Sequence, residues 1–208
     1  MKYMIENLLI GSGGTLGFYF LGCLKVLEKK GLLPNIKNIL GISVGSLIGL
    51  MLCLDYTIDE IYEFSIKLDL QKILNIKENS FLDISNNYGF DNGKSFIRVI
   101  QIVIKHKTGN KNITFKEMNA KFKKKLIVVG TNITKSKSNF FNYDTYPDMK
   151  VWEAIIISCS IPMVFQPYQF EDNLYLDGAV DQDYTIYFKE KYNTLNLIVE
   201  KIDNETRT

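Results

Sequence analysis

Apolar and polar residues in the amino-terminal part of the chain follow a pattern that predicts two strand–helix units. Asn7 to Ile10 is a short apolar run, and Phe18 to Lys30 carries apolar residues at helical spacing until Gly31 ends the pattern. Ile36 to Ile42 is again short, apolar and β-branched, and a helical pattern from Ser46 to Leu54 follows it. Strands that alternate with helices favour a parallel sheet covered on both faces.

Between about residues 57 and 125 the pattern changes to helical segments separated by polar turns. The first segment opens with Thr57-Ile58-Asp59-Glu60, in which a threonine precedes a glutamate by three positions, as in a helix capping box. We predict that this part of the chain is a helical insertion into the sheet-forming fold.

The sheet is predicted to resume after the insertion. Leu126 to Gly130 is an unbroken apolar run typical of a buried strand, and Asn139 to Tyr143 is a candidate for its neighbour. Trp152 to Ser158 has a helical pattern, and Tyr168 to Phe170 with Leu174 to Leu176 is predicted to form a hairpin. The predicted fold class is α/β, a single domain over residues 1–208 with a mainly parallel central sheet.

Composition limits the classes of function. Of the 208 residues, 46% are hydrophobic and 23% are charged, which excludes a disordered polyelectrolyte, and a formal charge of +2 gives no indication of nucleic-acid binding. Cys23, Cys53 and Cys159 each lie in an apolar run without metal-ligand spacing, so we expect three reduced core cysteines, no metal site and a cytoplasmic location. Met1 to Gly11 makes a poor secretory signal.

Ile39 to Leu54 raises the alternative of a membrane-spanning helix. The stretch is uncharged and holds Gly41, Gly45 and Gly49 at the spacing of close helix pairs in bilayers. It is shorter than the roughly 20 residues that cross a hydrocarbon core, and Ser43 adds a polar group. We therefore favour a buried strand and helix.

Gly41-Ile42-Ser43-Val44-Gly45 is the sharpest candidate for chemistry. A serine on a tight turn between strand and helix presents its hydroxyl when glycines on both sides leave room for it. The positive end of the following helix also favours negative charge that develops at Ser43. A pentapeptide of this kind also occurs by chance in ordinary turns, so it needs support from other residues.

Ser12-Gly13-Gly14-Thr15-Leu16-Gly17 is a second glycine-rich turn. The N–H groups of Gly13 and Gly14 are placed to stabilise an oxyanion, because exposed main-chain donors at a helix start suit that role. A phosphate-binding loop is the competing interpretation, but the Gly-Lys-Ser/Thr ending is missing. A dinucleotide site would need an acidic residue about 20 positions further on, where this chain has the serine turn.

A serine hydroxyl also needs a base, and His106 is the only histidine of the chain. Its neighbours Lys105 and Lys107 suit a solvated helix end better than a catalytic site. Asp177, followed by Gly178 at the end of a predicted strand, is the preferred candidate, because a carboxylate in a dry site can take the proton directly. An Asp-Gly hairpin turn is the competing interpretation of these two residues.

Taken in order, the loop from Ser12 to Gly17, the turn from Gly41 to Gly45 and the pair Asp177-Gly178 resemble the three signatures of patatin-like phospholipases. Further stretches that are similar to this family are Gly130-Thr131-Asn132, Phe141-Asn142-Tyr143, Pro147-Asp148-Met149, Val151-Trp152-Glu153-Ala154, Ser158-Cys159-Ser160-Ile161-Pro162 and Phe165-Gln166-Pro167. The resemblance implies a three-layer α/β/α fold and a calcium-independent lipid acyl hydrolase without a cofactor.

Roles for individual residues follow from the resemblance. It implies Ser43 as the nucleophile, Asp177 as its base, and the N–H groups of Gly13 and Gly14 as the oxyanion hole. The glycines expected to support these motifs are Gly17, Gly41, Gly45 and Gly178. The implied substrate is a phospholipid or another acyl ester, and no nucleic-acid partner is expected.

Departures from the family pattern keep two alternatives open. Leu16 stands where the family usually has arginine or lysine, and Ser12 replaces the first glycine of the loop. After Gly178 the chain continues with Asp181-Gln182-Asp183-Tyr184 instead of the family's Asn-x-Pro element. One alternative is a catalytically weak or inactive homologue that binds lipid or another protein. The other is a hydrolase of small esters or thioesters.

Peripheral contact with a membrane surface is a further expectation for an enzyme with a lipid substrate. The lysines that are candidates for contact with anionic lipid are Lys116, Lys121, Lys123, Lys124 and Lys125. A solvated helix face is the favoured interpretation of this run. The aromatic residues that are candidates for lining an acyl groove, with the core as the commoner alternative, are Tyr62, Phe64, Phe81, Tyr88 and Phe90.

Overall fold

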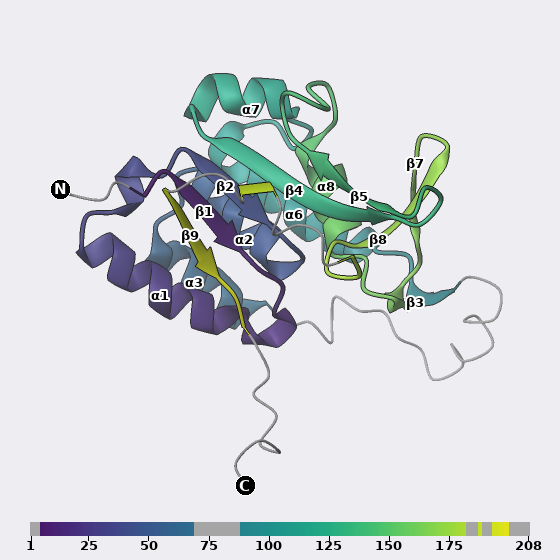
Figure 1. Ribbon diagram of the computed structural model, residues 1–208, viewed down its shortest axis with the longest axis horizontal. Coiled ribbons are helices and arrows are strands. Elements are labelled where there is room, and N and C mark those ends of the chain that lie inside the picture. Colours follow the sequence, from purple (N-terminus) through teal and green to yellow (C-terminus); the bar gives the residue numbers. More distant parts are fainter. Residues whose placement is uncertain (1–4, 69–87, 182–186, 189–192, 200–208) are drawn as a thin grey trace, which may run out of the picture.

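A mixed, mostly parallel sheet forms the centre of the protein in a computed structural model that describes residues 5–68, 88–181, 187–188 and 193–199 (Figure 1). Within those residues the main sheet has seven strands, in the order β7-β8-β4-β2-β1-β9 with β5 also paired to β4. The parallel strands are β1 (Asn7–Ile10), β2 (Asn38–Gly41), β4 (Lys125–Asn132) and β9 (Thr194–Leu197). The antiparallel strands are β5 (Lys137–Phe141), β7 (Tyr168–Phe170) and β8 (Asn173–Asp177).

The helices agree with the predicted ones to within two residues at their starts. Those expected from the sequence are α1 (Gly17–Lys29), α2 (Val44–Cys53) and α8 (Val151–Ser158). The insertion contributes α3 (Ile58–Lys67), α6 (Lys94–Thr108) and α7 (Phe115–Phe122). The shorter elements are the 3-10 helices η1 (Gly14–Leu16) and η2 (Leu33–Asn35) and the paired strands β3 (Gly89–Asp91) and β6 (Met163–Phe165).

Local hydrogen bonds explain where the inserted helices begin. The predicted capping box at the start of α3 is confirmed, because the N–H of Glu60 donates to Thr57 Oγ1 at 3.1 Å and the N–H of Thr57 donates to Glu60 Oε2 at 2.7 Å. Thr114 and Glu117 form the same arrangement at the start of α7. The helical character predicted for the insertion is therefore confirmed within its described residues, although β3 also lies there.

Side chains of successive strand residues separate into two buried clusters on opposite faces of the sheet. The larger cluster joins one sheet face to residues of α1, α2, α3, α6, α7 and α8; its strand residues include Leu8, Ile10, Ile39, Leu126 and Val128. The smaller cluster contains Phe188, with Ala179 and Tyr187 packed against it; its strand residues are Leu9, Leu40, Ile127 and Val129, and Ile42 directly after β2 joins them. Both faces of the sheet are thus buried, as predicted.

Strands β2 and β8 lie end to end along one edge of β4. Val128 of β4 pairs with Gly41 of β2 on one edge and with β5 on the other. Two residues further on, Gly130 still pairs with β5, but its second partner is Asp177 of β8. β8 therefore takes the edge that β2 leaves, and Ser43, two residues after the end of β2, arrives where β8 ends.

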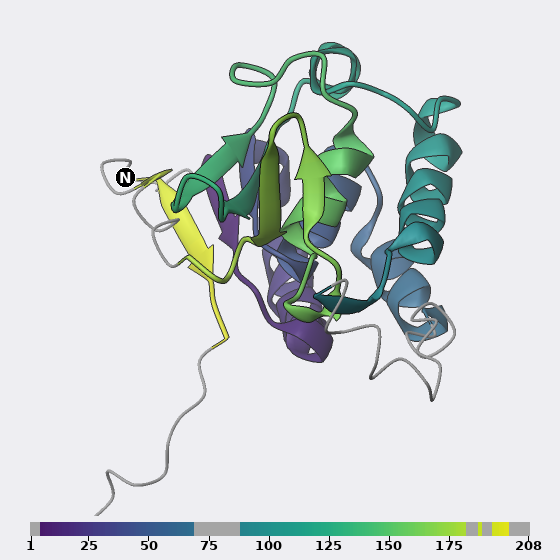
Figure 2. The ribbon, with the colours of Figure 1, turned by 90° about the vertical axis from the view of Figure 1, so that its right-hand side faces the viewer.

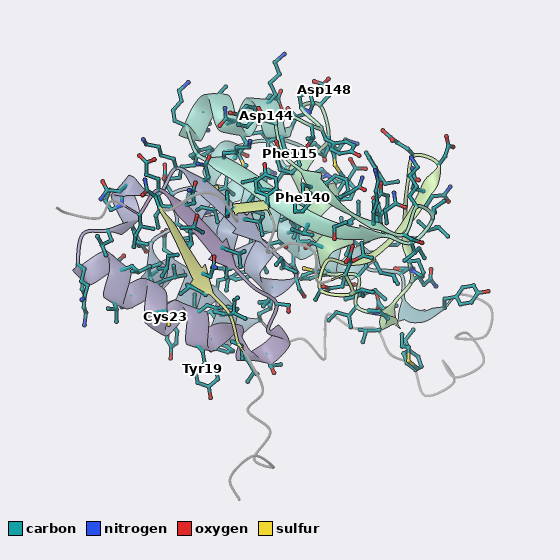
Figure 3. All side chains as sticks on the ribbon, viewed as in Figure 1. Tyr19, Cys23, Phe115, Phe140, Asp144 and Asp148 are labelled. Carbon is teal, nitrogen blue, oxygen red and sulfur yellow. The ribbon has the colours of Figure 1, made fainter. Side chains whose placement is uncertain are left out.

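One sequence expectation, the burial of all three cysteines, is wrong. Cys23 is exposed, unlike the buried Cys53 and Cys159, because the face of α1 that packs on the protein is formed by other residues, among them Phe20 and Leu24; Figure 3 shows Cys23 pointing away from the fold. β9, which was not among the predicted strands, pairs with β1 in parallel. None of the described helices is long and apolar enough to cross a membrane.

Candidate active site

Ser43 occupies a strained turn between β2 and α2. Its backbone has φ 53° and ψ −126°, an unusual conformation for a residue with a side chain. Its N–H donates to Ser158 Oγ at 3.0 Å, and its carbonyl oxygen accepts from the Ser46 hydroxyl at 2.7 Å. The residue is only 5% exposed. The predicted strand-to-helix elbow is therefore present, and hydrogen bonds on both sides hold it.

The glycines around Ser43 are required by close backbone packing. A Cβ on Gly41 would lie 2.4 Å from the Cα of Ser46, and a Cβ on Gly45 would lie 2.2 Å from the carbonyl oxygen of Ile10. These contacts are far shorter than any that real side chains make. The two glycines thus allow α2 to start directly against β1 and β2. Ser43 is thereby placed just beyond the carboxyl-terminal end of β2.

Gly17 and Gly178 also allow close packing between segments around the site. A Cβ on Gly17 would lie 2.8 Å from the side chain of Val44, and one on Gly178 would lie 2.3 Å from the carbonyl oxygen of Val129. Gly17 therefore lets α1 approach the elbow. Gly178 lets the chain after β8 pass close to β4.

Asp177 ends β8 and is almost completely buried, at 3% exposure. Its N–H donates to the carbonyl oxygen of Ser160 at 2.8 Å, and its own carbonyl oxygen accepts from Thr131 Oγ1 at 2.9 Å. The side-chain atom Oδ1 accepts from the N–H of Ala179 at 2.8 Å, whereas Oδ2 is buried without a hydrogen-bond partner. One carboxylate oxygen is thus fixed and the other is unpaired.

Burial raises the pKa of Asp177 to about 6 from an ordinary value of 3.8. The hydrogen bond from Ala179 opposes this rise, and so does a weaker interaction with the Ser43 side chain. Ser43 is therefore close enough to influence the carboxyl group, although no well-formed hydrogen bond to Oδ2 joins the two. Such contacts are often loose in proteins without a bound substrate.

The glycine loop leaves its donors free. Gly14 has φ 52°, in the left-handed region that favours glycine, and Gly13 precedes η1 in an extended φ of −173°. The N–H groups of Gly13 and Gly14 donate to no acceptor among the described residues, whereas that of Leu16 turns back to the Gly13 carbonyl oxygen at 2.8 Å. The loop therefore offers main-chain donors at the start of α1.

An apolar pocket of about 480 Å³ connects the loop with the elbow. Gly14, Ser43 and Val44 line one part of it, and Met51 and Phe96 are among the apolar side chains that line the rest. This volume falls in the range of small-molecule sites, roughly 300 to 1,000 Å³. Ser43 thus lies at the wall of an apolar cavity, close to the buried carboxyl group of Asp177.

The other predicted candidates have mixed outcomes. Phe64 lines the pocket, but Tyr62 and Tyr88 are exposed and Phe90 is not among the lining residues. Phe81 lies outside the described residues. His106 is on α6, where its Nδ1 lies 3.1 Å from the Tyr56 hydroxyl and its ring stacks on that of Tyr56. It neither lines the pocket nor contacts Ser43 or Asp177, as its lysine neighbours suggested.

Three residues that support the site were given no role from the sequence. Ser158, at the end of α8, accepts the Ser43 N–H, and its carbonyl oxygen accepts the Gly178 N–H at 3.3 Å. Ser160 and Thr131 hold the backbone of Asp177. All three residues lie in stretches that resemble the family, Gly130-Thr131-Asn132 and Ser158-Cys159-Ser160. The sequence could not show which atoms they contact, because those contacts join segments that are far apart along the chain.

A family model described as Patatin-like phospholipase matches residues 8–186. The chain belongs to the patatin-like phospholipase family. The match covers the glycine loop, the elbow and Asp177. Within the described residues no group of three or more His, Cys, Asp or Glu side chains is placed to hold a metal ion.

Relatives of this patatin-like chain include viral and fungal proteins. It is 33% identical to "Probable lipid hydrolase 463L" of Invertebrate iridescent virus 6, over 90% of this chain and 64% of that protein. It is 34% identical to "Uncharacterized protein R571" of Acanthamoeba polyphaga mimivirus, over 88% and 60% respectively. "Triacylglycerol lipase 4" of Saccharomyces cerevisiae is 27% identical, with 94% of this chain and 24% of the lipase aligned. The chain thus spans less than two thirds of the length of these relatives.

Solved structures support the fold. VipD from Legionella pneumophila superposes with a TM-score of 0.65 at 16% identity, covering 93% of this chain and 49% of VipD. ExoU of Pseudomonas aeruginosa, in its complex with SpcU, gives a TM-score of 0.62 at 19% identity, covering 93% and 43%. The α/β/α patatin-like fold predicted from the sequence is therefore confirmed.

Proposed function

We propose that the protein hydrolyses acyl esters of phospholipids or related lipids, with Ser43 as the nucleophile and Asp177 as the base. The observation that carries this proposal is a strained serine at the wall of an apolar pocket beside a buried carboxyl group with an unpaired oxygen and a pKa of about 6. A carboxylate with that pKa is ionised at neutral pH and still basic enough to take a proton in the reaction.

In the first half of the proposed reaction, Ser43 Oγ attacks the ester carbonyl carbon while its proton passes to Asp177 Oδ2. The carbonyl oxygen becomes an oxyanion, which the N–H groups of Gly13 and Gly14 stabilise together with the positive end of α2. The Ser43 N–H is not available for this task because Ser158 accepts it. Collapse of the intermediate breaks the ester bond, and the leaving alcohol takes the proton from Asp177.

In the second half, a water molecule gives a proton to Asp177 and attacks the acyl-enzyme. The same donors stabilise the second oxyanion. The fatty acid then leaves, and Ser43 recovers its proton from Asp177. No step of the proposed reaction needs a cation.

Hydrolysis by purified protein tests the proposal. Wild type should hydrolyse a soluble short-chain ester and phosphatidylcholine, and Ser43→Ala should lower kcat by roughly 10⁴ or more, since a nucleophile is removed. A fluorophosphonate probe should label wild type and leave Ser43→Ala unlabelled. Equal activity in the two proteins would show that the nucleophile is another residue, and an inert wild type would refute the proposed catalysis.

The pH profile tests Asp177 separately. The base must be ionised to accept a proton, so activity should be lost as the pH falls through the pKa of about 6. We expect kcat/KM to reach a plateau above neutral pH and to fall about tenfold per pH unit on the acid side. An unchanged rate at pH 5, measured with a soluble ester on folded protein, would exclude Asp177 as the base.

A further inference from the structure

We propose that the mouth of the pocket docks on the surface of a phospholipid bilayer through an apolar rim. The rim consists of five exposed apolar side chains: Phe18, Ile66 and Ile161 line the pocket, and Leu16 and Met163 are neighbours in sequence of lining residues. This inference rests on the proposed function, because it concerns how a lipid reaches Ser43.

The rim continues the apolar surface of the pocket to the outside of the protein. Phe18, Ile66 and Ile161 line the pocket, yet they are 46%, 51% and 40% exposed. Leu16 is 45% exposed and lies in sequence between the lining residues Thr15 and Gly17. An acyl chain that passes across the rim would therefore remain in contact with apolar side chains on its way into the pocket.

Three separate segments contribute to the rim, namely η1 with the start of α1, the end of α3, and the chain around β6. Figure 2 shows all three in the lower part of the molecule. Tyr19, 68% exposed, also points outward below α1 in Figure 3. Single exposed apolar residues need no explanation, but a group around a pocket marks an interaction site.

Met163 supplies an independent observation. It is 61% exposed and has φ 67°, a left-handed conformation that is uncommon for a residue with a Cβ. Insertion of the thioether side chain into lipid would remove this exposed apolar surface from water.

Leu16 fits the same explanation. A cation at this position would be held at the head-group level of a bilayer. Leucine instead adds an apolar side chain beside the pocket. The exposed Leu16 side chain therefore extends the apolar surface next to the lining residues Thr15 and Gly17.

The lysine run is at the opposite end. Figure 1 shows α7 at the top of the molecule, far from η1, and Figure 3 shows the carboxylates of Asp144 and Asp148 close to that end. Lys124 pairs with Asp55 at 2.7 Å, and Lys125 pairs with Asp144. A membrane bound to these lysines would face away from the pocket, so we assign docking to the rim.

Vesicle flotation tests the rim. In a Ser43→Ala background, which leaves the lipid intact, the protein should bind phosphatidylcholine vesicles equally well in 0.05 and 0.5 M salt, because apolar contact is not screened. The double variant Leu16→Gln/Met163→Asn, whose Asn tolerates left-handed φ, should bind at least about tenfold more weakly. Neither position lines the pocket, and both are exposed.

Two control variants make the result specific. Ile102→Gln/Leu174→Gln removes two exposed apolar side chains elsewhere, and Lys116→Gln/Lys121→Gln removes two cations of the lysine run. Both should bind like the parent. Unchanged binding of the rim variant, or an equal loss in either control, would overturn the proposal.

A soluble short-chain ester separates this inference from the proposed function. With Ser43 intact, the rim variant should keep wild-type activity on the soluble ester while its hydrolysis of vesicle lipid falls in step with binding. Rim-dependent binding by a protein that cleaves no ester would refute the proposed function alone. Ester cleavage without rim-dependent binding would refute the rim alone.

Discussion

The elbow at Ser43 and the loop at Gly13 and Gly14 meet at one pocket, but the protein holds them in place by different means. A Cβ on Gly45 of the elbow would lie 2.2 Å from the Ile10 carbonyl oxygen, so packing demands glycine there. A Cβ on Gly14 would meet no atom within 4 Å. Gly14 is instead demanded by its φ of 52°, a matter of backbone conformation alone.

This difference indicates that the elbow contributes mainly to the stability of the fold and that the glycine loop contributes mainly to the proposed reaction. The elbow is part of the core, since α2 is buried along nearly its whole length behind it. The glycine loop is exposed at Gly14 and leaves two N–H groups without acceptors among the described residues. Substitutions of the elbow glycines Gly41 and Gly45 should therefore act on stability, and substitutions of the loop glycines should act on rate.

The largest effect is expected for Gly45→Ala. The added methyl group would collide with backbone that has no room to move, so the free energy of unfolding should fall by more than about 4 kcal/mol. Gly22→Ala is the matched control, because its Cβ would meet no atom within 4 Å in the middle of α1. That variant should gain about 0.5 to 1 kcal/mol from helix propensity. Urea unfolding measures both, and similar values for the two would remove packing as the reason for Gly45.

Gly14→Ala should leave the fold intact and lower the rate. A left-handed φ costs about 1 to 2 kcal/mol for a residue with a Cβ. The loop should relax away from this conformation and turn a proposed oxyanion donor out of line, which lowers kcat by about 10². Gly14→Asn should lose less, since Asn tolerates this conformation. Equal kcat values for wild type, Ala and Asn, measured on a soluble ester, would show that the loop does not act in the transition state.

The same contrast explains which parts of the site could be predicted from the sequence. The elbow and the loop are local turns, so their glycines and short spacing identify them. The alternation of strands and helices around them is equally local, and it gave the fold class. Asp177 is different: the sequence makes it a candidate base, but Asp-Gly by itself more commonly indicates a hairpin turn, and the family resemblance favours the catalytic interpretation.

What escaped prediction depends on contacts between distant segments. β9 is a four-residue strand whose partner β1 lies near the other end of the chain, and no local pattern specifies that pairing. Likewise, β8 reaches Ser43 because it replaces β2 along β4 at Gly130. The register of three strands decides this, and side-chain pattern determines only which face each residue takes.

Ser158 provides the smallest and most specific test, because it ties the elbow by a hydrogen bond instead of by packing. Ser158→Ala would leave the buried Ser43 N–H without its acceptor, which should cost about 1 to 3 kcal/mol of stability. The turn would also lose a restraint next to the nucleophile, so we expect kcat on a soluble ester to fall about tenfold while KM stays constant.

Ser160→Ala is the matched control for Ser158→Ala. Both side chains are buried at the end of α8, but the Ser160 hydroxyl donates to the Ile156 carbonyl oxygen and does not touch Ser43. Its loss should lower stability by a similar amount and leave kcat unchanged, because the backbone of Ser160 still accepts the Asp177 N–H. Equal kcat values for the two variants would mean that the Ser158 bond only stabilises the fold. A selective loss in Ser158→Ala would show that the elbow needs hydrogen bonding as well as close packing to present its serine.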